Sequence, residues 1–239
     1  MNKSIYYKEN TIHYKNLLTE GHNLDKFIIN DKLYGRPDHD FSTLLRLLKP
    51  ESVVYDIGAY IGTFSIPFAL EGMKVHSFEG FPDNCKRLKE NCSPYQNIEV
   101  YQIAVHNKTE TIITKFNDCT TKEAEEREIN YVIFDDFIKE NNIEHPDLLK
   151  IDIEGMETLA LFGMTRLLEE IRPIWQVGYH AGLDIKYDGY PGFVKPEDGG
   201  FDFNTFTELG YYIYNEHNSR VSQFQNFGEY ICVPKEKIK

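Results

Sequence analysis

The chain has 239 residues, of which 41% are hydrophobic and 27% charged, and its formal net charge is −12. This length and composition suit one α/β domain with insertions and a sizeable core. The acidic balance argues against a nucleic-acid partner, because such surfaces need lysine and arginine against phosphates. Apolar runs fall short of the ~20 residues that span a bilayer. The start lacks a secretory leader and the four cysteines form no CxxC pair, so we expect a cytoplasmic protein with reduced thiols.

The first forty residues differ from the rest of the chain. Residues 1–40 are polar and rich in Tyr, Asn and Lys, with one clear apolar patch at 27–33. They predict an N-terminal cap segment with a short hairpin, ahead of one larger domain over 41–239. From Phe41 onward, apolar residues recur at helical spacing until Pro50, which predicts a short packing helix.

Apolar runs then alternate with helical segments. The predicted elements are a strand at 53–57, a helix at 63–70, a strand at 75–78, a helix from Pro82 and a strand at 98–105. This alternation is typical of βαβ units. It therefore predicts a doubly wound α/β fold with a mostly parallel sheet and helices on both faces.

Residues 106–130 interrupt this rhythm and form a first predicted insertion. A β-rich piece at 111–116 and the charged stretch at 122–128 indicate a solvated hairpin or loop. The alternation then resumes. The predicted elements are a strand at 131–134, a short helix through Lys139, a strand at 148–153, one amphipathic helix from Met156 to Leu167 and a strand at 174–179.

The last sixty residues predict a second insertion and a sheet edge. Residues 181–200 are rich in Gly, Pro and Tyr, which fits either a lid over an acceptor pocket or an ordinary surface excursion. A helix is predicted near 203–209, followed by strands at 211–214 and 230–233. Because no helix separates these two strands, they indicate an antiparallel C-terminal edge.

The stretch VVYDIGAYIGTFS at 53–65 carries the clearest functional pattern: an apolar strand, an acid at its end and a glycine turn into a helix. Glycines tolerate positive φ and let a cofactor approach the backbone, and ligands of open α/β sheets bind outside the carboxyl ends of strands. The loop lacks the middle glycine of GxGxxG, which weakens a nicotinamide site. A purely structural turn is the alternative. The predicted cofactor-binding residues are Asp56, Gly58, Ala59, Tyr60 and Gly62.

Glu79 ends the second predicted strand, where an acid accepts hydrogen bonds from the two ribose hydroxyls of a nucleoside. Gly80, which follows it directly, is also a predicted cofactor-binding residue. Ala104, near the end of the third predicted strand, is expected to border an adenine ring. The alternative is that Glu79 is a solvated acid beside the start of a helix.

The stretch LLKIDIEGMET places Asp152 and Glu154 two residues apart at the end of the fourth predicted strand. Period-two spacing puts both on one side if the strand continues that far. Such carboxylates orient an acceptor hydroxyl, take its proton or hold a divalent cation. Two structural alternatives remain: Glu154 as a favourable charge at the following helix start, and Lys150 as a buried ion-pair partner.

His180 ends the fifth predicted strand, in QVGYHAG. An imidazole there serves as a general base, as a metal ligand or only as a satisfied buried polar group. Asp152, Glu154 and His180 are therefore the predicted catalytic residues. They are also the candidate ligands for Mg²⁺ or Mn²⁺.

Taken together, four stretches resemble the FkbM family of methyltransferases: VVYDIGAYIGTFS, VHSFEG, FDDFIKENNIEHPDLLKIDIEGMETLALFGM and IRPIWQVGYH. The resemblance covers about residues 40–233. It implies a class I methyltransferase fold, Rossmann-like in kind, with S-adenosylmethionine as the donor and usually an O-methyl product on sugars or natural products. By position it implies that residues 56–62 form the donor loop, that Glu79 is the ribose acid and that Asp152 with Glu154 is the family's DxEG segment.

The chain departs from the family pattern at two positions. Gly80 stands where proline is common, and Gly178 stands two residues before His180, where an acid is frequent. The second departure removes a metal ligand or base from the acceptor side.

We therefore expect an S-adenosylmethionine-dependent O-methyltransferase acting on a hydroxyl of a sugar, nucleotide-activated or glycan-linked, or of a similar small acceptor. Asp152 is expected to be essential and Glu79 to serve donor affinity. The alternatives are methylation of a non-sugar secondary metabolite, a nicotinamide-dependent reductase and a catalytically silent nucleoside-binding protein. Since two-fold dimers are the commonest oligomers, a homodimer is the default expectation.

Overall fold

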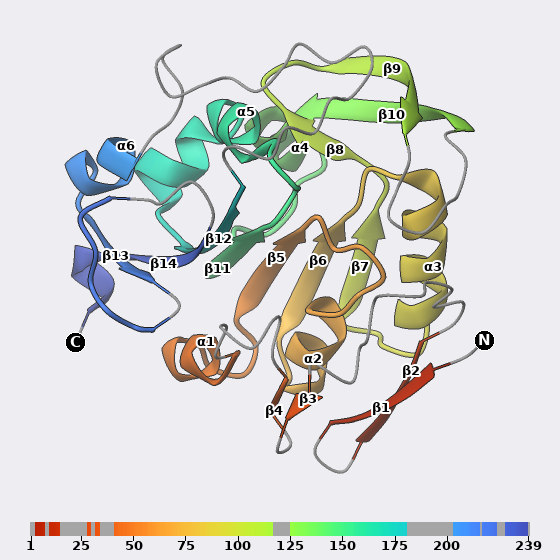
Figure 1. The fold of residues 1–239 in the computed structure, drawn as a ribbon, viewed down its shortest axis with the longest axis horizontal. Coiled ribbons are helices and arrows are strands. Elements are labelled where there is room, and N and C mark those ends of the chain that lie inside the picture. The colour runs from red at the N-terminus through yellow and green to blue at the C-terminus, as the bar shows by residue number, and fades with distance from the viewer. Residues whose placement is uncertain are drawn as a thin grey trace.

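The computed structural model describes residues 3–7, 10–14, 28–29, 32–33, 41–116, 125–180, 203–215, 217–223 and 228–238. Seven strands form the central sheet (Figure 1). Across the sheet their order is β13 (Tyr211–Asn215), β14 (Gly228–Pro234), β12 (Ile174–Tyr179), β11 (Leu148–Ile151), β5 (Val53–Ile57), β6 (Lys74–Phe78) and β7 (Ile98–Tyr101). The strands from β12 to β7 are parallel, and β14 is antiparallel to both of its neighbours. The predicted doubly wound sheet with an antiparallel C-terminal edge is confirmed.

Helices cover both faces of this sheet. One face carries α1 (Phe41–Leu47), α2 (Ser65–Leu70) and α3 (Pro82–Cys92); the other carries α4 (Phe134–Glu140), α5 (Glu157–Phe162), a π-helical turn (Leu167–Ile171) and α6 (Phe203–Glu208). Alternate residues of a strand point to opposite faces. Accordingly Tyr55 joins the α4–α5 core, whereas Val54 joins the α1–α3 core.

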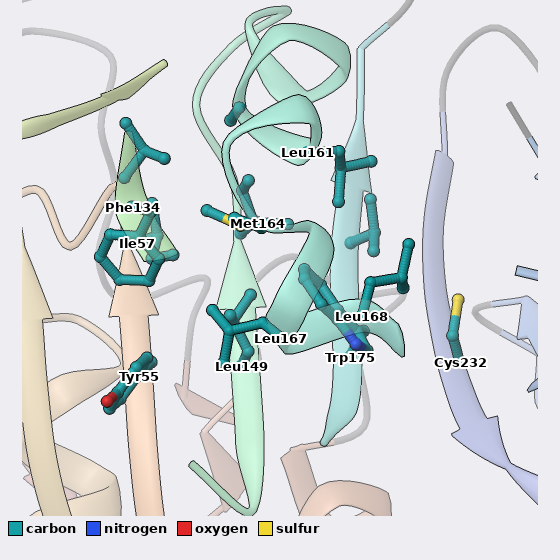
Figure 2. Packing of buried hydrophobic residues seen from close by; sticks show 14 of the residues in the cluster. Tyr55, Ile57, Phe134, Leu149, Leu161, Met164, Leu167, Leu168, Trp175 and Cys232 are labelled. Atoms are coloured by element: carbon teal, nitrogen blue, oxygen red, sulfur yellow. The ribbon is translucent and has the colours of Figure 1, made fainter. Parts of the chain in front are cut away.

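The core on the α4–α5 face combines aromatic and aliphatic side chains, and Figure 2 shows Tyr55, Phe134 and Trp175 among the aliphatic residues of this cluster. The Phe78 ring lies 4.8 Å from the Phe134 ring and 5.0 Å from the Tyr101 ring, centre to centre. Trp175 is fully buried and meets Phe206 edge to face. Such aromatic contacts add to the stabilisation from apolar burial. These contacts help to hold the strands of the sheet in place.

The strand order places a topological switch at β5. The chain passes from β5 to β6 and β7 on one side, and later returns to β11 and β12 on the other. In open α/β sheets such a switch leaves a crevice outside the carboxyl ends of the strands. The backbone N–H of Asp152, just after β11, donates to the carbonyl of Ile57 at the end of β5, over 3.1 Å. The two predicted functional stretches therefore meet there.

The single strand predicted at 98–105 is wrong. It is two strands, β7 in the main sheet and β8 (Ala104–His106), which pairs in parallel with β10 (Glu125–Ile133). The reason is that the insertion supplies a second sheet: β9 (Glu110–Phe116) pairs antiparallel with β10, so β8 has its own partner outside the main sheet. The hairpin expected at 106–130 is confirmed, but its second strand starts before the predicted residue 131. Residues 117–124 lie outside the described residues.

The single helix predicted from Met156 to Leu167 is also wrong. Helix α5 ends at Phe162, and the chain turns at Gly163 before the π-helical turn begins at Leu167. A Cβ at Gly163 would overlap the carbonyl oxygen of His106. The close approach of β8 therefore fixes this break, and apolar spacing alone does not reveal it.

The N-terminal residues that the structure describes form two hairpins. One pairs β1 (Lys3–Tyr7) with β2 (Asn10–Tyr14), and the other pairs β3 (Ile28–Ile29) with β4 (Lys32–Leu33), whereas one short hairpin was predicted within residues 1–40. A short 3₁₀ helix (Lys235–Lys237) follows β14.

The predicted insertion at 181–200 and Cys119 lie outside the described residues. Cys85, Cys92 and Cys232 are buried free thiols. In the described ranges, no helix combines the length and apolar character needed to cross a bilayer.

Candidate active site

The glycine loop wraps over the end of β5 and is pinned to β6. The backbone N–H groups of Gly58 and Ala59 both donate to the carbonyl of Phe78, over 2.9 and 3.1 Å. Gly58 and Gly62 have φ of 75° and 95°, and Tyr60 has φ of 53°. A left-handed conformation costs energy in a residue with a side chain, and such strain gathers at functional sites. The backbone conformation of the loop therefore favours a functional loop over an ordinary connecting turn.

Close packing also leaves little space for a side chain at either glycine. A Cβ at Gly58 would overlap the carbonyl oxygen of Asp152, and one at Gly62 would lie 3.2 Å from Cys92 Sγ and Leu88 Cδ1. The loop thus touches the end of β11 on one side and α3 on the other. This packing sets the predicted cofactor loop directly against the predicted catalytic acid.

Glu79 links the glycine loop to the start of α3. It is buried, and its two carboxylate oxygens accept from the backbone N–H groups of Tyr60 (2.8 Å) and Phe81 (2.9 Å). Burial raises the pKa of Glu79 to about 7, although both N–H groups oppose the rise; the Asp56 charge adds to it and Lys150 offsets it. The carboxyl therefore changes charge near neutral pH.

Asp56 lies beneath the loop, fully buried. One carboxylate oxygen forms an ion pair with Lys150 Nζ at 3.1 Å, and the other accepts from the Ser65 hydroxyl at 2.6 Å. Ser65 in turn accepts from the Ser77 hydroxyl at 2.8 Å. The predicted ion pair of Lys150 is confirmed. Asp56 supports the loop from below, and a direct contact with a cofactor stays a prediction.

The segment after β11 is a tight turn, not a strand. The strand ends at Ile151, and Glu154 (φ 56°) and Gly155 (φ 102°) are left-handed. The predicted extension of the strand to residue 153 is therefore wrong, and the condition under which strand alternation would align Asp152 with Glu154 is not met. The turn is held by Glu157, whose carboxylate accepts from the N–H groups of Ile153 and Gly155 at 3.0 to 3.1 Å.

Glu157 is a residue that sequence reasoning missed. It is almost fully buried, and its Oε1 lies 3.2 Å from Nδ1 of His180. Its carboxylate accepts from the backbone N–H groups of Ile153 and Gly155, in the turn that precedes α5. The available signal was an acid in the first turn of the helix that follows the DxEG segment.

His180 is buried among carboxylates. Its Nδ1 lies 3.7 Å from Asp152 Oδ1 in addition to the Glu157 contact. Burial by itself lowers the pKa of His180, but the hydrogen bond to Glu157 and the charges of Asp152, Glu157 and Glu154 outweigh it and raise the pKa to about 9. The imidazole is therefore a cation at neutral pH in this arrangement.

The three predicted catalytic residues come together. Asp152, Glu154 and His180 each offer one ligand atom, and these atoms lie within 4.8 Å of one another. Asp152 Oδ1 is buried and has no hydrogen-bond partner among the described residues. Oxygen donors with one imidazole suit Mg²⁺ or Mn²⁺. A Cβ at Gly178 would lie 3.1 Å from Asp152 Cγ. Glycine at this position, where the family often has an acid, therefore leaves space for the Asp152 side chain.

Two further predicted cofactor-binding residues, Gly80 and Ala104, also lie together. A Cβ at Gly80 would be 2.7 Å from the Cβ of Ala104, so only glycine fits there without a shift. The close approach of β8 therefore explains why glycine stands at this position, where the family commonly has proline. Gly80 and Ala104 together border the end of β6 beside Glu79.

A glycine loop after β5, an acid after β6 and a switch in strand order at β5 are typical of the class I methyltransferase fold, which is Rossmann-like. The family model of the methyltransferase FkbM domain matches residues 56–213, more than half of the chain. The chain belongs to the FkbM methyltransferase family. The crystal structure of methyltransferase FkbM from Methylobacillus flagellatus KT shares this fold, with a TM-score of 0.54, 19% identity, and coverage of 82% of this chain and 48% of that one.

Two proteins of known name are similar over part of their length. The hexuronic acid methyltransferase AglP of Haloferax volcanii is 27% identical over 151 residues, which is 60% of this chain and 62% of that protein. A tRNA (guanine(37)-N(1))-methyltransferase of Phytophthora infestans is 34% identical over 83 residues, 35% of this chain and 17% of that protein. The chain thus spans less than two thirds of each of these relatives.

Proposed function

We propose that this chain transfers a methyl group from S-adenosylmethionine to an oxygen, the hydroxyl of a sugar. The observation that carries the proposal is the contact between the glycine loop and Asp152, where Gly58 leaves no space for a side chain beside the Asp152 carbonyl. A donor on the loop would therefore present its methyl group next to the Asp152 carboxylate. Glu79, at the other end of the loop, would accept hydrogen bonds from the ribose.

The reaction is an in-line displacement. The acceptor oxygen forms a bond to the methyl carbon, the carbon–sulfur bond breaks and its electron pair goes to sulfur, leaving S-adenosylhomocysteine. The chain must hold the acceptor oxygen about 3 Å from the methyl carbon and in line with the breaking bond. Asp152 accepts the hydroxyl proton as a general base. Its side chain is 30% exposed, so an acceptor reaches it.

A sugar acceptor is supported by the relative named as a hexuronic acid methyltransferase. A hexuronic acid offers both hydroxyl and carboxylate oxygens. We assign the hydroxyl because its proton needs a base, which the partly exposed Asp152 would supply, whereas a carboxylate acceptor needs none. The net charge of −12 argues against a tRNA acceptor, despite the second relative.

The first test is calorimetric titration with S-adenosylmethionine and, separately, NADH. Binding of the former alone supports the proposal, and binding of NADH alone would replace it with a reductase. Labelled donor is then incubated with uronic-acid glycans, neutral nucleotide sugars and tRNA. An alkali-stable label on sugar supports hydroxyl methylation, whereas an alkali-labile methyl ester or a label on tRNA contradicts it. Donor binding with no transfer to any acceptor favours a silent nucleoside-binding protein.

We also propose that Asp152, Glu154 and, after loss of its imidazolium proton, His180 bind a divalent cation such as Mg²⁺ or Mn²⁺. The support is the proximity of their ligand atoms and the buried Asp152 Oδ1, which accepts no hydrogen bond from the described residues. A cation bound there would lower the pKa of an acceptor hydroxyl. Titration with Mn²⁺ alone is expected to show binding to the wild type that is lost in Glu154→Gln and retained in Glu140→Gln, an exposed acid on α4. Equal behaviour of the two variants would refute this site.

Donor binding is expected to depend on pH through Glu79. The carboxylate form accepts from ribose hydroxyls, and its pKa of about 7 means that the donor binds more tightly as pH rises through 7. Affinity should fall about tenfold from pH 8 to pH 6. The effect of Glu79 on folding stability has the opposite pH dependence. Because its pKa is higher in the folded chain than in the unfolded chain, Glu79 stabilises the fold below its unfolded-state pKa, and this contribution is lost as pH rises through 7.

Calorimetry across this range checks the prediction, and Glu79→Gln supplies the control. The amide does not titrate, so the variant should bind weakly with a flat pH profile. A wild-type profile that is equally flat would show that Glu79 does not set donor affinity.

A further inference from the structure

We propose that Lys150 is a positioning residue that fixes the donor loop against the acceptor side of the crevice. This inference rests on the proposed donor site and names a residue that the reaction itself does not use. Lys150 is buried in the middle of β11, in register with Asp56 of β5 and Gln176 of β12. It therefore lies directly below the point where the glycine loop meets the turn that carries Asp152.

The contacts of Lys150 lead to the loop. Its Nζ forms the 3.1 Å ion pair with Asp56, and the same carboxylate holds the hydroxyl of Ser65, the first residue of α2. Nζ also lies 4.9 Å from the ring centre of Phe64, the residue before α2. Asp56 precedes the loop, and Phe64 and Ser65 follow it. One buried ammonium thus holds both ends of the loop.

The charges that act on Lys150 also include a carboxylate of the acceptor side. Burial alone would lower the pKa of Lys150, but Asp56, Asp152 and Glu229 raise it overall, so the side chain stays a cation. Glu229 belongs to β14 and Asp152 to the turn after β11. The ammonium thus pairs directly with the carboxylate under the loop, and the charge of the predicted base also favours its protonated form.

A buried ion pair is weak evidence for stability, because desolvation offsets the attraction, and losing one partner leaves an unpaired charge. The test must therefore separate loop positioning from charge neutralisation. Lys150→Met leaves Asp56 unpaired, whereas the double variant Lys150→Met with Asp56→Asn leaves neither charge. Lys150→Arg keeps the cation. Lys139→Met, on the exposed side of α4, is the matched control.

Three measurements are made on each full-length variant: melting temperature, hydrogen exchange of the amides at 58–65, and calorimetric affinity for S-adenosylmethionine. The double variant is expected to melt near the wild type yet to exchange faster at 58–65, and Lys150→Met, which keeps the predicted cofactor residue Asp56, is expected to bind the donor about tenfold more weakly. Lys150→Arg should restore both exchange and affinity to within about threefold. In Lys150→Met the pH midpoint of donor binding should also move upward, because a cation that favours the Glu79 carboxylate is lost.

The proposal is overturned if the double variant matches the wild type in exchange at 58–65, since Lys150 would then only neutralise Asp56. It is also overturned if Lys150→Arg behaves like Lys150→Met at constant melting temperature. Hydrogen exchange needs no ligand. If the wild type does not bind S-adenosylmethionine, the proposed function fails, while the exchange data still decide the role of Lys150.

Discussion

Asp152→Asn is expected to lower methyl transfer by about 10²–10⁴-fold, the usual contribution of a general base. The amide keeps the volume of the side chain but cannot take the acceptor proton. The backbone N–H of Asp152, which donates to Ile57, is unchanged, and so is its carbonyl beside Gly58. Donor affinity should therefore stay within about threefold of the wild type. Single-turnover transfer of labelled methyl, together with donor calorimetry, separates these two effects.

The control for this change is Asp136→Asn. Asp136 is exposed in the first turn of α4, none of the contacts given for the candidate site involves it, and it undergoes the same chemical change. It should retain wild-type transfer. If Asp152→Asn retains full turnover, the base lies elsewhere in the crevice. If it loses donor affinity as much as turnover, Asp152 serves binding rather than proton transfer.

Much of the fold follows from local pattern. The strands at 53–57, 75–78 and 174–179 are short apolar runs bounded by helical segments or breakers, and such runs in a βαβ rhythm have few other arrangements. The glycine loop was predictable for the same reason, because a glycine turn between an apolar strand and a helical segment is a local pattern.

The parts that sequence reasoning missed depend on contacts between distant segments. The break of the helix at Gly163 is fixed by the carbonyl of His106, and the split of 98–105 is fixed by pairing of β8 with β10. Neither partner is close in sequence. The period of a local pattern carries no record of such approaches.

The same distinction explains the candidate site. Asp152, Glu154 and His180 were predicted because each ends or follows a strand, and parallel strands end at one edge. Glu157 was missed because its importance comes from the left-handed turn at Glu154, which makes two N–H groups available to one carboxylate. That conformation is a property of the folded turn rather than of residue spacing.

Gly58→Ala is expected to destabilise the chain by about 2–5 kcal/mol, as left-handed strain adds to overpacking. The added methyl would overlap the carbonyl oxygen of Asp152, which belongs to the backbone and cannot rotate away. Relief requires the loop and the end of β11 to move apart. Donor binding and methyl transfer should then fall together, because the same contact aligns the donor with Asp152. Urea unfolding measures the first effect and donor calorimetry the second.

Gly72→Ala separates the two causes. Gly72 has φ of 85°, close to the 75° of Gly58, but a Cβ there would meet only Pro50 Cβ at an ordinary 3.7 Å. It should carry the left-handed cost alone, about 1–2 kcal/mol, with donor affinity unchanged. The difference between the two variants then measures how tightly the loop is pressed against β11. Equal destabilisation of both would mean that this contact yields easily, and the alignment of donor and base would then need another support.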